Sequence, residues 1–128
     1  MQNPIPILVV DDEPIARARL KTALERHGYA VETCSDGAEA IEQLREHAFR
    51  VVVTDIRMDG VDGLQVLDLV RKNYPEIATI LITGYASVEV AREGLAKGAF
   101  DLIAKPFRPR DLRAIIERAL QKSRPRGD

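Results

Sequence analysis

Ile5–Val10 has the sequence IPILVV, and three acidic residues, Asp11–Glu13, follow it directly. Further along, Val51–Thr54 reads VVVT and leads straight into Asp55. Both runs have the length of a strand and are apolar at nearly every position. Strands of this kind are buried on both faces, as in a parallel sheet that helices cover on both sides. These two stretches therefore predict an α/β fold.

The rest of the chain alternates between similar apolar runs and longer amphipathic segments. Further strands are expected at Tyr29–Cys34, Ile77–Ile82 and Phe100–Ala104. Helices are expected over Pro14–His27, after the cap Asp36 with Glu39 three residues on, over Gly63–Asn73, after the cap Ser87, and from Pro109. Five strand–helix repeats joined by right-handed crossovers predict a doubly wound five-stranded parallel sheet.

Some residues are expected to have structural roles only. Cys34 is interpreted as a small apolar filler of its strand. Asp62 with Gly63 is expected to shape a turn and begin a helix. In the fourth predicted helix, the residues expected to face inward are Val88, Ala91 and Leu95.

The composition limits the classes of function. The chain of 128 residues fits one domain, and its formal net charge of −1 predicts no bulk affinity for nucleic acid or for an anionic membrane. The single cysteine precludes an internal disulfide. The N-terminus has no signal-peptide pattern, and no apolar run approaches the ~20 residues of a membrane span. We therefore expect a cytoplasmic protein that binds neither nucleic acid directly nor a membrane.

Polar residues follow four of the predicted strands at the point where each strand ends. They are Asp11 and Asp12 after the first, Asp55 after the third, Thr83 after the fourth and Lys105 after the fifth. Open α/β sheets bind ligands beyond the carboxyl ends of their strands. If the first and third strands are neighbours, the three acids converge and repel one another, so the cluster requires a cation. Carboxylate ligands favour Mg²⁺.

These residues are suited to phosphoryl transfer, which requires positioning and neutralisation of charge. Asp55 is expected to be the nucleophile that forms an aspartyl phosphate. Asp12 is expected to bind the metal directly, with Asp11 acting through a water or as a second ligand. The backbone carbonyl of Arg57 completes the predicted metal ligands. Thr83 and Lys105 are expected to hold two phosphoryl oxygens.

Five segments in this order and spacing resemble the receiver domain of bacterial two-component response regulators. They are Val9–Glu13, Thr54–Met58, Asp62–Leu64, Ile82–Gly84, and Gly98–Asp101 leading to Lys105–Phe107. The resemblance covers about residues 5–121 and is strongest to receivers of nitrogen-regulation-type transcription activators. It implies a flavodoxin-like (βα)5 fold with strand order 2-1-3-4-5, a receiver domain at residues 1–121, and a polar tail or cut linker at 122–128. It also implies a cis peptide bond between Lys105 and Pro106.

The resemblance further implies a function. The phosphoryl donor would be a sensor histidine kinase, a phosphotransfer protein or a small molecule such as acetyl phosphate. The chain would not be an enzyme for external substrates, since it would catalyse only its own phosphorylation and dephosphorylation, with Mg²⁺ as cofactor. Phosphorylation would draw Thr83 inward and change the face formed by the fourth helix, fifth strand and last helix, through which such receivers often dimerise.

Two departures from the family pattern leave an alternative open. Leu102 stands where receivers carry an aromatic switch residue, with Tyr85 as a substitute for it, and Asp59 replaces a proline in the loop after Asp55. Both favour a degenerate receiver that binds partners without phosphorylation. A second alternative is an aspartate-nucleophile phosphohydrolase of the haloacid-dehalogenase type. That class carries a second acid two residues after the nucleophile, where this chain has Arg57.

Overall fold

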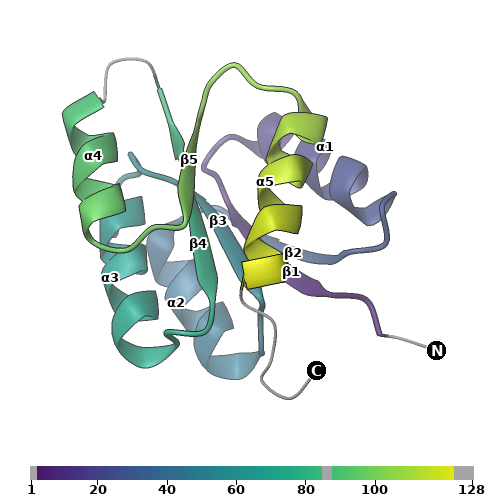
Figure 1. Cartoon of the computed structure of the whole chain (residues 1–128), viewed down its shortest axis with the longest axis horizontal. Coiled ribbons are helices and arrows are strands. Elements are labelled where there is room, and N and C mark those ends of the chain that lie inside the picture. Colours follow the sequence, from purple (N-terminus) through teal and green to yellow (C-terminus); the bar gives the residue numbers. More distant parts are fainter. Residues whose placement is uncertain (1–2, 85–87, 123–128) are drawn as a thin grey trace.

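The computed structural model describes residues 3–84 and 88–122, which form five parallel strands and five helices in strict alternation (Figure 1). The strands are β1 (Pro6–Val10), β2 (Ala30–Cys34), β3 (Val51–Asp55), β4 (Ala78–Thr83) and β5 (Asp101–Ala104). The helices are α1 (Pro14–Glu25), α2 (Gly37–Glu46), α3 (Gly63–Asn73), α4 (Val88–Ala96) and α5 (Pro109–Lys122). The sheet order is β2-β1-β3-β4-β5, which confirms the predicted fold and strand order.

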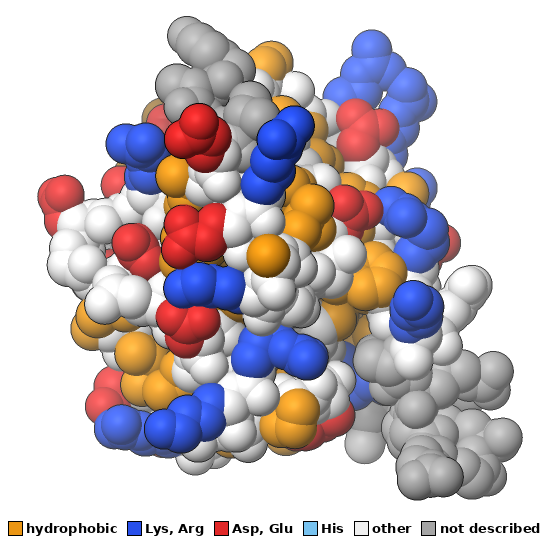
Figure 2. Space-filling model, turned by 60° about the vertical axis from the view of Figure 1, so that its left-hand side comes forward, with side chains coloured by type: hydrophobic (Ala, Val, Ile, Leu, Met, Phe, Trp, Pro, Cys, Tyr) orange, Lys and Arg blue, Asp and Glu red, His pale blue; other side chains and the backbone are white. Residues whose placement is uncertain are grey.

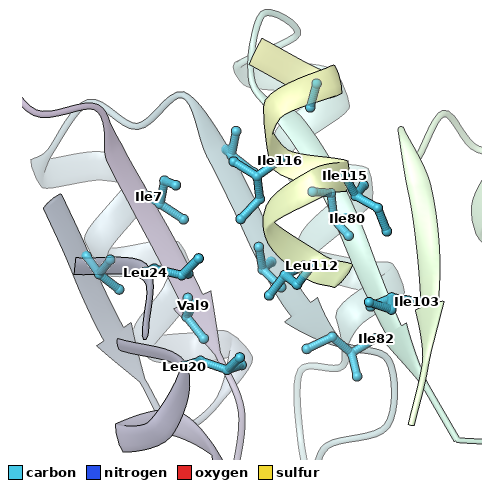
Figure 3. Close-up of a cluster of buried hydrophobic side chains, with 14 residues drawn as sticks. Ile7, Val9, Leu20, Leu24, Ile80, Ile82, Ile103, Leu112, Ile115 and Ile116 are labelled. Atoms are coloured by element: carbon cyan, nitrogen blue, oxygen red, sulfur yellow. The ribbon is translucent and has the colours of Figure 1, made fainter. Parts of the chain in front are cut away.

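The two faces of the sheet explain why its strands are apolar throughout. On β1, Ile7 and Val9 belong to one core cluster, whereas Leu8 and Val10 belong to another on the opposite face. In the first cluster, side chains of α1 and α5 pack against the sheet, as Figure 3 shows. The second is closed by α2 and α3. Every strand residue in the middle of the sheet is therefore buried, as the apolar runs predicted.

Local signals set the ends of several helices. The carboxylate of Asp36 accepts the backbone N–H of Glu39 at 2.8 Å, as its capping position predicted. Asp62 and Gln65 form a complete capping box at the start of α3. Gly28 follows α1 with a φ of +90°, and Gly98 follows α4 with a φ of +105°, the left-handed conformation that glycine tolerates best.

Helix α4 corrects one prediction, because Leu95 is 45% exposed instead of facing inward. Among the residues of α4 whose exposure is described, which exclude Val88, the buried ones are Ala91 and Gly94. A Cβ atom on Gly94 would lie 2.4 Å from Leu81 Cδ1, so the helix approaches β4 most closely at this glycine. The buried face is therefore centred on Gly94, which turns Leu95 outward.

The structure describes only some of the residues of the predicted tail, helix cap and switch. Helix α5 runs to Lys122, the first residue of the expected tail. The rest of that tail, the cap Ser87 and the switch candidate Tyr85 lie outside the described residues. In the part of the chain that is described, no helix combines the length and the apolar character needed to cross a membrane.

Thr79 on β4 offers a test of the core. Its hydroxyl is buried without a hydrogen-bond partner, and its side chain is 1% exposed. Thr79→Val keeps the shape of the side chain and removes the desolvated hydroxyl, so we expect unfolding to require about 1 kcal/mol more free energy. Urea denaturation measures the change, with Thr79→Ser, which keeps the hydroxyl, as the control. A Thr79→Val variant no more stable than the native chain would contradict the conclusion that the Thr79 hydroxyl is buried without a hydrogen-bond partner among the described residues.

Candidate functional site

The carboxyl ends of the parallel strands bring the predicted site residues to one edge of the sheet. Asp55 is the last residue of β3 and Thr83 the last of β4, while Asp11 and Lys105 directly follow β1 and β5. Val10 pairs with Thr54 between β1 and β3, so Asp11 and Asp55 come next on adjacent strands. The expected neighbourhood of the first and third strands is thus confirmed.

Three carboxylates gather at this edge. Asp11, Asp12 and Asp55 each offer an oxygen within 4.8 Å of the others, a grouping that concerns the described residues alone. Asp11 and Asp55 are buried, at 1% and 7% exposure, whereas Asp12 is exposed. One oxygen of Asp11, Oδ1, accepts the N–H of Glu13 at 2.8 Å. The other, Oδ2, is buried and has no hydrogen-bond partner.

Lys105 supplies the positive charge of the site. Its Nζ lies 3.2 Å from Asp55 Oδ2 and 3.7 Å from Asp11 Oδ2. Partial burial works to lower the pKa of the ammonium, but the carboxylates of Asp55 and Asp11 outweigh it and raise the pKa above its usual value. Lys105 therefore stays protonated at neutral pH. The Lys105–Pro106 peptide bond is cis, as the resemblance implied.

One lysine does not neutralise the cluster. Burial, followed by repulsion from Asp11, raises the pKa of Asp55 to about 7 despite the opposing effect of Lys105. At neutral pH, such a carboxyl ionises fully only when more positive charge is placed beside it. The donors are oxygens, Asp11 Oδ2 has no hydrogen-bond partner among the described residues, and the net charge of the cluster is negative, so these residues fit a hard divalent cation.

Hydrogen bonds hold the main chain around Asp55. The Thr54 hydroxyl donates to the Asp55 carbonyl at 3.0 Å, and the Ile56 N–H donates to the Ile82 carbonyl on β4 at 3.0 Å. The Gly63 N–H donates to the Ile56 carbonyl at 2.8 Å. These bonds fix the end of β3 relative to β4 and to the start of α3.

Gly63 has a role that the sequence interpretation did not identify. A Cβ atom at this position would lie 2.1 Å from the Asp55 carbonyl oxygen and 2.8 Å from Ile56 Cα, so only glycine lets α3 begin this close to β3. The Asp62-Gly63-Leu64 segment is the available signal, but the sequence predicts only a turn and the start of a helix there, which α3 confirms. Distinguishing a turn glycine from a close-approach glycine requires the tertiary packing.

The other candidate residues are placed as follows. The Thr83 hydroxyl donates to the Gly84 carbonyl at 2.9 Å. Leu102 is partly buried and packs against the core cluster that contains Leu81. The side chain of Arg57 is exposed, and the role of its carbonyl as a ligand stays a prediction. Burial raises the pKa of the Cys34 thiol to about 12, in keeping with a filler rather than a reactive group.

Comparison with known proteins places this geometry in a family. Residues 7–117 match the family model of the response regulator receiver domain. The nitrogen assimilation regulatory protein NtrX of Azorhizobium caulinodans is 35% identical over 124 residues, which cover 95% of this chain and 27% of that protein. The transcriptional regulatory protein ZraR of Escherichia coli K12 is 40% identical over 116 residues, 91% of this chain and 26% of that protein. The chain thus spans about a quarter of the length of these relatives.

Solved structures agree with the sequence matches. The receiver domain of NtrX from Brucella abortus has a TM-score of 0.85 and 37% identity, covering 90% of this chain and 98% of that chain. A response regulator receiver domain protein from Clostridium thermocellum has a TM-score of 0.88 and 32% identity, covering 92% and 95%. Because the family model spans most of the chain and solved receivers share its whole fold, this chain belongs to the response regulator receiver domain family.

Proposed function

We propose that this receiver accepts a phosphoryl group on Asp55 in a two-component signalling pathway. The observation that carries the proposal is the ion pair of buried Asp55 with the ammonium of Lys105, which also lies near the Asp11 oxygen that lacks a hydrogen-bond partner. A carboxylate oxygen of Asp55 would form the new bond to phosphorus while the donor's bond to phosphorus breaks. The leaving group keeps that electron pair, so Asp55 must be ionised when it attacks.

We propose Mg²⁺ as the cofactor, held by Asp11, Asp12, Asp55 and the backbone carbonyl of Arg57. When bound, the cation would supply the positive charge that the site lacks and offset the negative charge of the phosphoryl oxygens. It would also return Asp55 to its ionised, nucleophilic form at neutral pH, since its pKa of about 7 reflects burial and the nearby Asp11 charge.

Lys105 and Thr83 are proposed to hold the transferred group. Lys105 already contacts the attacking carboxylate at 3.2 Å, so a phosphoryl oxygen on Asp55 would lie within reach of the same ammonium. The Thr83 hydroxyl, which donates to the Gly84 carbonyl, would have to exchange that bond for a phosphoryl oxygen. This exchange is the proposed start of the conformational change. Leu102 on β5 is the proposed switch residue, and Tyr85, outside the described residues, is its proposed substitute.

The proposed partners follow from the family. A sensor histidine kinase or a phosphotransfer protein would donate the group, and the α4-β5-α5 face would mediate a homodimer or contact an attached output domain. Residues 1–121 would form the receiver and 122–128 a tail or linker. On the described residues of the face in Figure 2, basic and acidic side chains are interspersed rather than gathered by sign. That pattern favours protein partners over direct contact with a nucleic acid backbone.

The alternatives account for less of the site. A degenerate receiver would gain nothing from a buried Asp55 paired with Lys105, although Leu102 lacks the hydroxyl of the usual switch residue. The phosphohydrolase alternative does not fit the family to which the chain belongs. Phosphoacceptance is therefore the function that we propose.

The test is intact-mass measurement after incubation with acetyl phosphate. We expect the native chain to gain one phosphate group with Mg²⁺ present and none with EDTA, and we expect hydroxylamine to remove the group, as it does an acyl phosphate. Phosphate uptake that is unaffected by EDTA would contradict the proposed cofactor. A folded chain that gains no phosphate from either acetyl phosphate or a panel of phosphorylated histidine kinases would favour the degenerate receiver.

A further inference from the structure

The loop Asp11–Glu13 between β1 and α1 supplies two of the three acidic ligands of the proposed site, yet α1 begins without a side-chain cap. Glu13 occupies the N-cap position, and its side chain makes no capping hydrogen bond. The first turn of α1 contains no acidic residue either. Apart from Pro14 at the first helical position, α1 therefore lacks the usual features that order the start of a helix, at the place where two ligands must be placed accurately.

Three other hydrogen bonds hold this loop. The Asp11 N–H donates to the Cys34 carbonyl at the end of β2 at 3.1 Å. The Glu13 N–H donates to Asp11 Oδ1 at 2.8 Å, which leaves Oδ2 for the site. The third bond comes from the guanidinium of Arg17, whose Nη1 donates to the Asp11 carbonyl at 2.8 Å. Among these three, only the Arg17 bond comes from a charged side chain.

Arg17 lies in an unfavourable place for a cation. Its backbone N–H bonds the Glu13 carbonyl at 3.0 Å, so the residue belongs to the first turn of α1, where the positive end of the helix dipole disfavours positive charge. The side chain is nevertheless half-buried and folded back over the loop. A solvent-exposed arginine at this position would avoid the cost of burial, so the contact with the Asp11 carbonyl is what the folded-back side chain gains.

The charge of Arg17 also acts on Glu39 in the first turn of α2. Hydrogen bonds from Ser35 lower the pKa of Glu39, and the charge of Arg17 lowers it further. Glu39 in turn accepts the backbone N–H of Ser35 at 2.7 Å. Arg17 thus donates a hydrogen bond to the acidic loop after β1, and its charge also affects Glu39.

We infer that Arg17 is a positioning residue for the metal site, because its bond to the Asp11 carbonyl fixes the loop from which Asp11 and Asp12 reach the cation. The inference rests on the proposed function. Loss of an outer partner that orients metal ligands typically weakens metal affinity by about 10–100-fold. The hydrogen bond is charge-assisted, which places it among the stronger ones.

The sign of the effect separates positioning from simple electrostatics. Arg17 is a cation near a site for a cation, so through-space repulsion alone would make Mg²⁺ bind more tightly when the guanidinium is removed. Positioning predicts the opposite, weaker binding. Arg26→Ala, at the far end of the same helix and equally one positive charge lower, shows the effect of net charge alone.

The experiment is titration of the ¹⁵N-labelled chain with MgCl₂ at constant ionic strength, followed by amide NMR shifts, which also report that each variant is folded. We expect Arg17→Ala to weaken Mg²⁺ binding about tenfold or more, and Arg26→Ala to leave it unchanged or slightly tighter. Arg17→Gln keeps a donor without the charge, and we expect an intermediate affinity. It also serves as the test if Arg17→Ala does not fold.

The outcomes distinguish failure of this inference from failure of the proposed function on which it rests. If the native chain binds Mg²⁺ and Arg17→Ala binds it equally well or more tightly, the positioning role is wrong and the proposed function stands. If the native chain itself shows no Mg²⁺-dependent shifts, both are overturned. Weaker binding in Arg17→Ala with an unchanged Arg26→Ala supports the inference.

Discussion

The Asp55→Asn chain is expected to gain no phosphate from acetyl phosphate under conditions in which the native chain gains one. The amide cannot form the acyl phosphate, and no other acid of the described cluster has the Lys105 ammonium as close as 3.2 Å. Intact mass measures the result. Asp59→Asn is the matched control, since it removes the same charge from an exposed position in the neighbouring loop. Phosphate on Asp55→Asn would place the acceptor elsewhere.

The same substitution should also stabilise the metal-free chain in a pH-dependent way. The folded-state pKa of Asp55 is about 7, well above that of an unfolded aspartate, and this value already includes the favourable contact with Lys105. The folded chain therefore binds the extra proton, and native stability falls as pH rises from about 4 to about 7. Asparagine has no proton to lose, so the advantage of the variant is absent at low pH and complete above neutrality.

We expect this advantage to be about 2–4 kcal/mol at pH 8 in EDTA and close to zero near pH 4. Urea denaturation of both chains at the two pH values measures it. Mg²⁺ should reduce the difference at pH 8, because it would stabilise the native carboxylate cluster more than the variant. An advantage of the same size at both pH values would show that ionisation of Asp55 is not its cause.

Gly63→Ala is expected to have the largest effect of any single methyl group added near the site. The new Cβ would overlap the carbonyl oxygen of Asp55 and crowd Ile56 Cα, and both are main-chain atoms that cannot move as a flexible side chain can. We expect a loss of about 3 kcal/mol or more in the free energy of unfolding, at the upper end for overpacked positions. Weaker phosphate uptake should accompany it, because relieving the clash must displace the end of β3.

Gly84→Ala is the control for this prediction. A Cβ atom at Gly84 meets no atom of the described residues within 4 Å, so its effect on stability should be small although it lies at the same edge of the sheet. Urea denaturation compares the two variants. Equal stabilities would contradict the close approach of α3 to β3.

The sequence by itself determined the class of the fold and indicated which polar residues meet at one edge of the sheet. Apolar runs such as Ile5–Val10 and Val51–Thr54 can be stable only in a sheet buried on both faces, and parallel pairing then sends every strand end to one edge. The roles of Asp36 and Gly28 at helix ends were also predicted correctly, because helix capping depends on residues that are neighbours in the chain.

Tertiary structure alone decided the features that depend on how closely elements approach one another. The periodicity of α4 allowed Leu95 to face inward, and only the contact of Gly94 with Leu81 turned it outward. The sequence predicts Gly63 only as a residue of a turn and helix start, and only the packing of α3 against Asp55 shows that a close approach requires glycine there. Three further features depend on distances across strands and helices. They are the Asp11 oxygen without a hydrogen-bond partner among the described residues, the raised pKa of Asp55, and the hydrogen bond from Arg17 to the Asp11 carbonyl. No pattern along the chain contains those distances, because packing in three dimensions sets them.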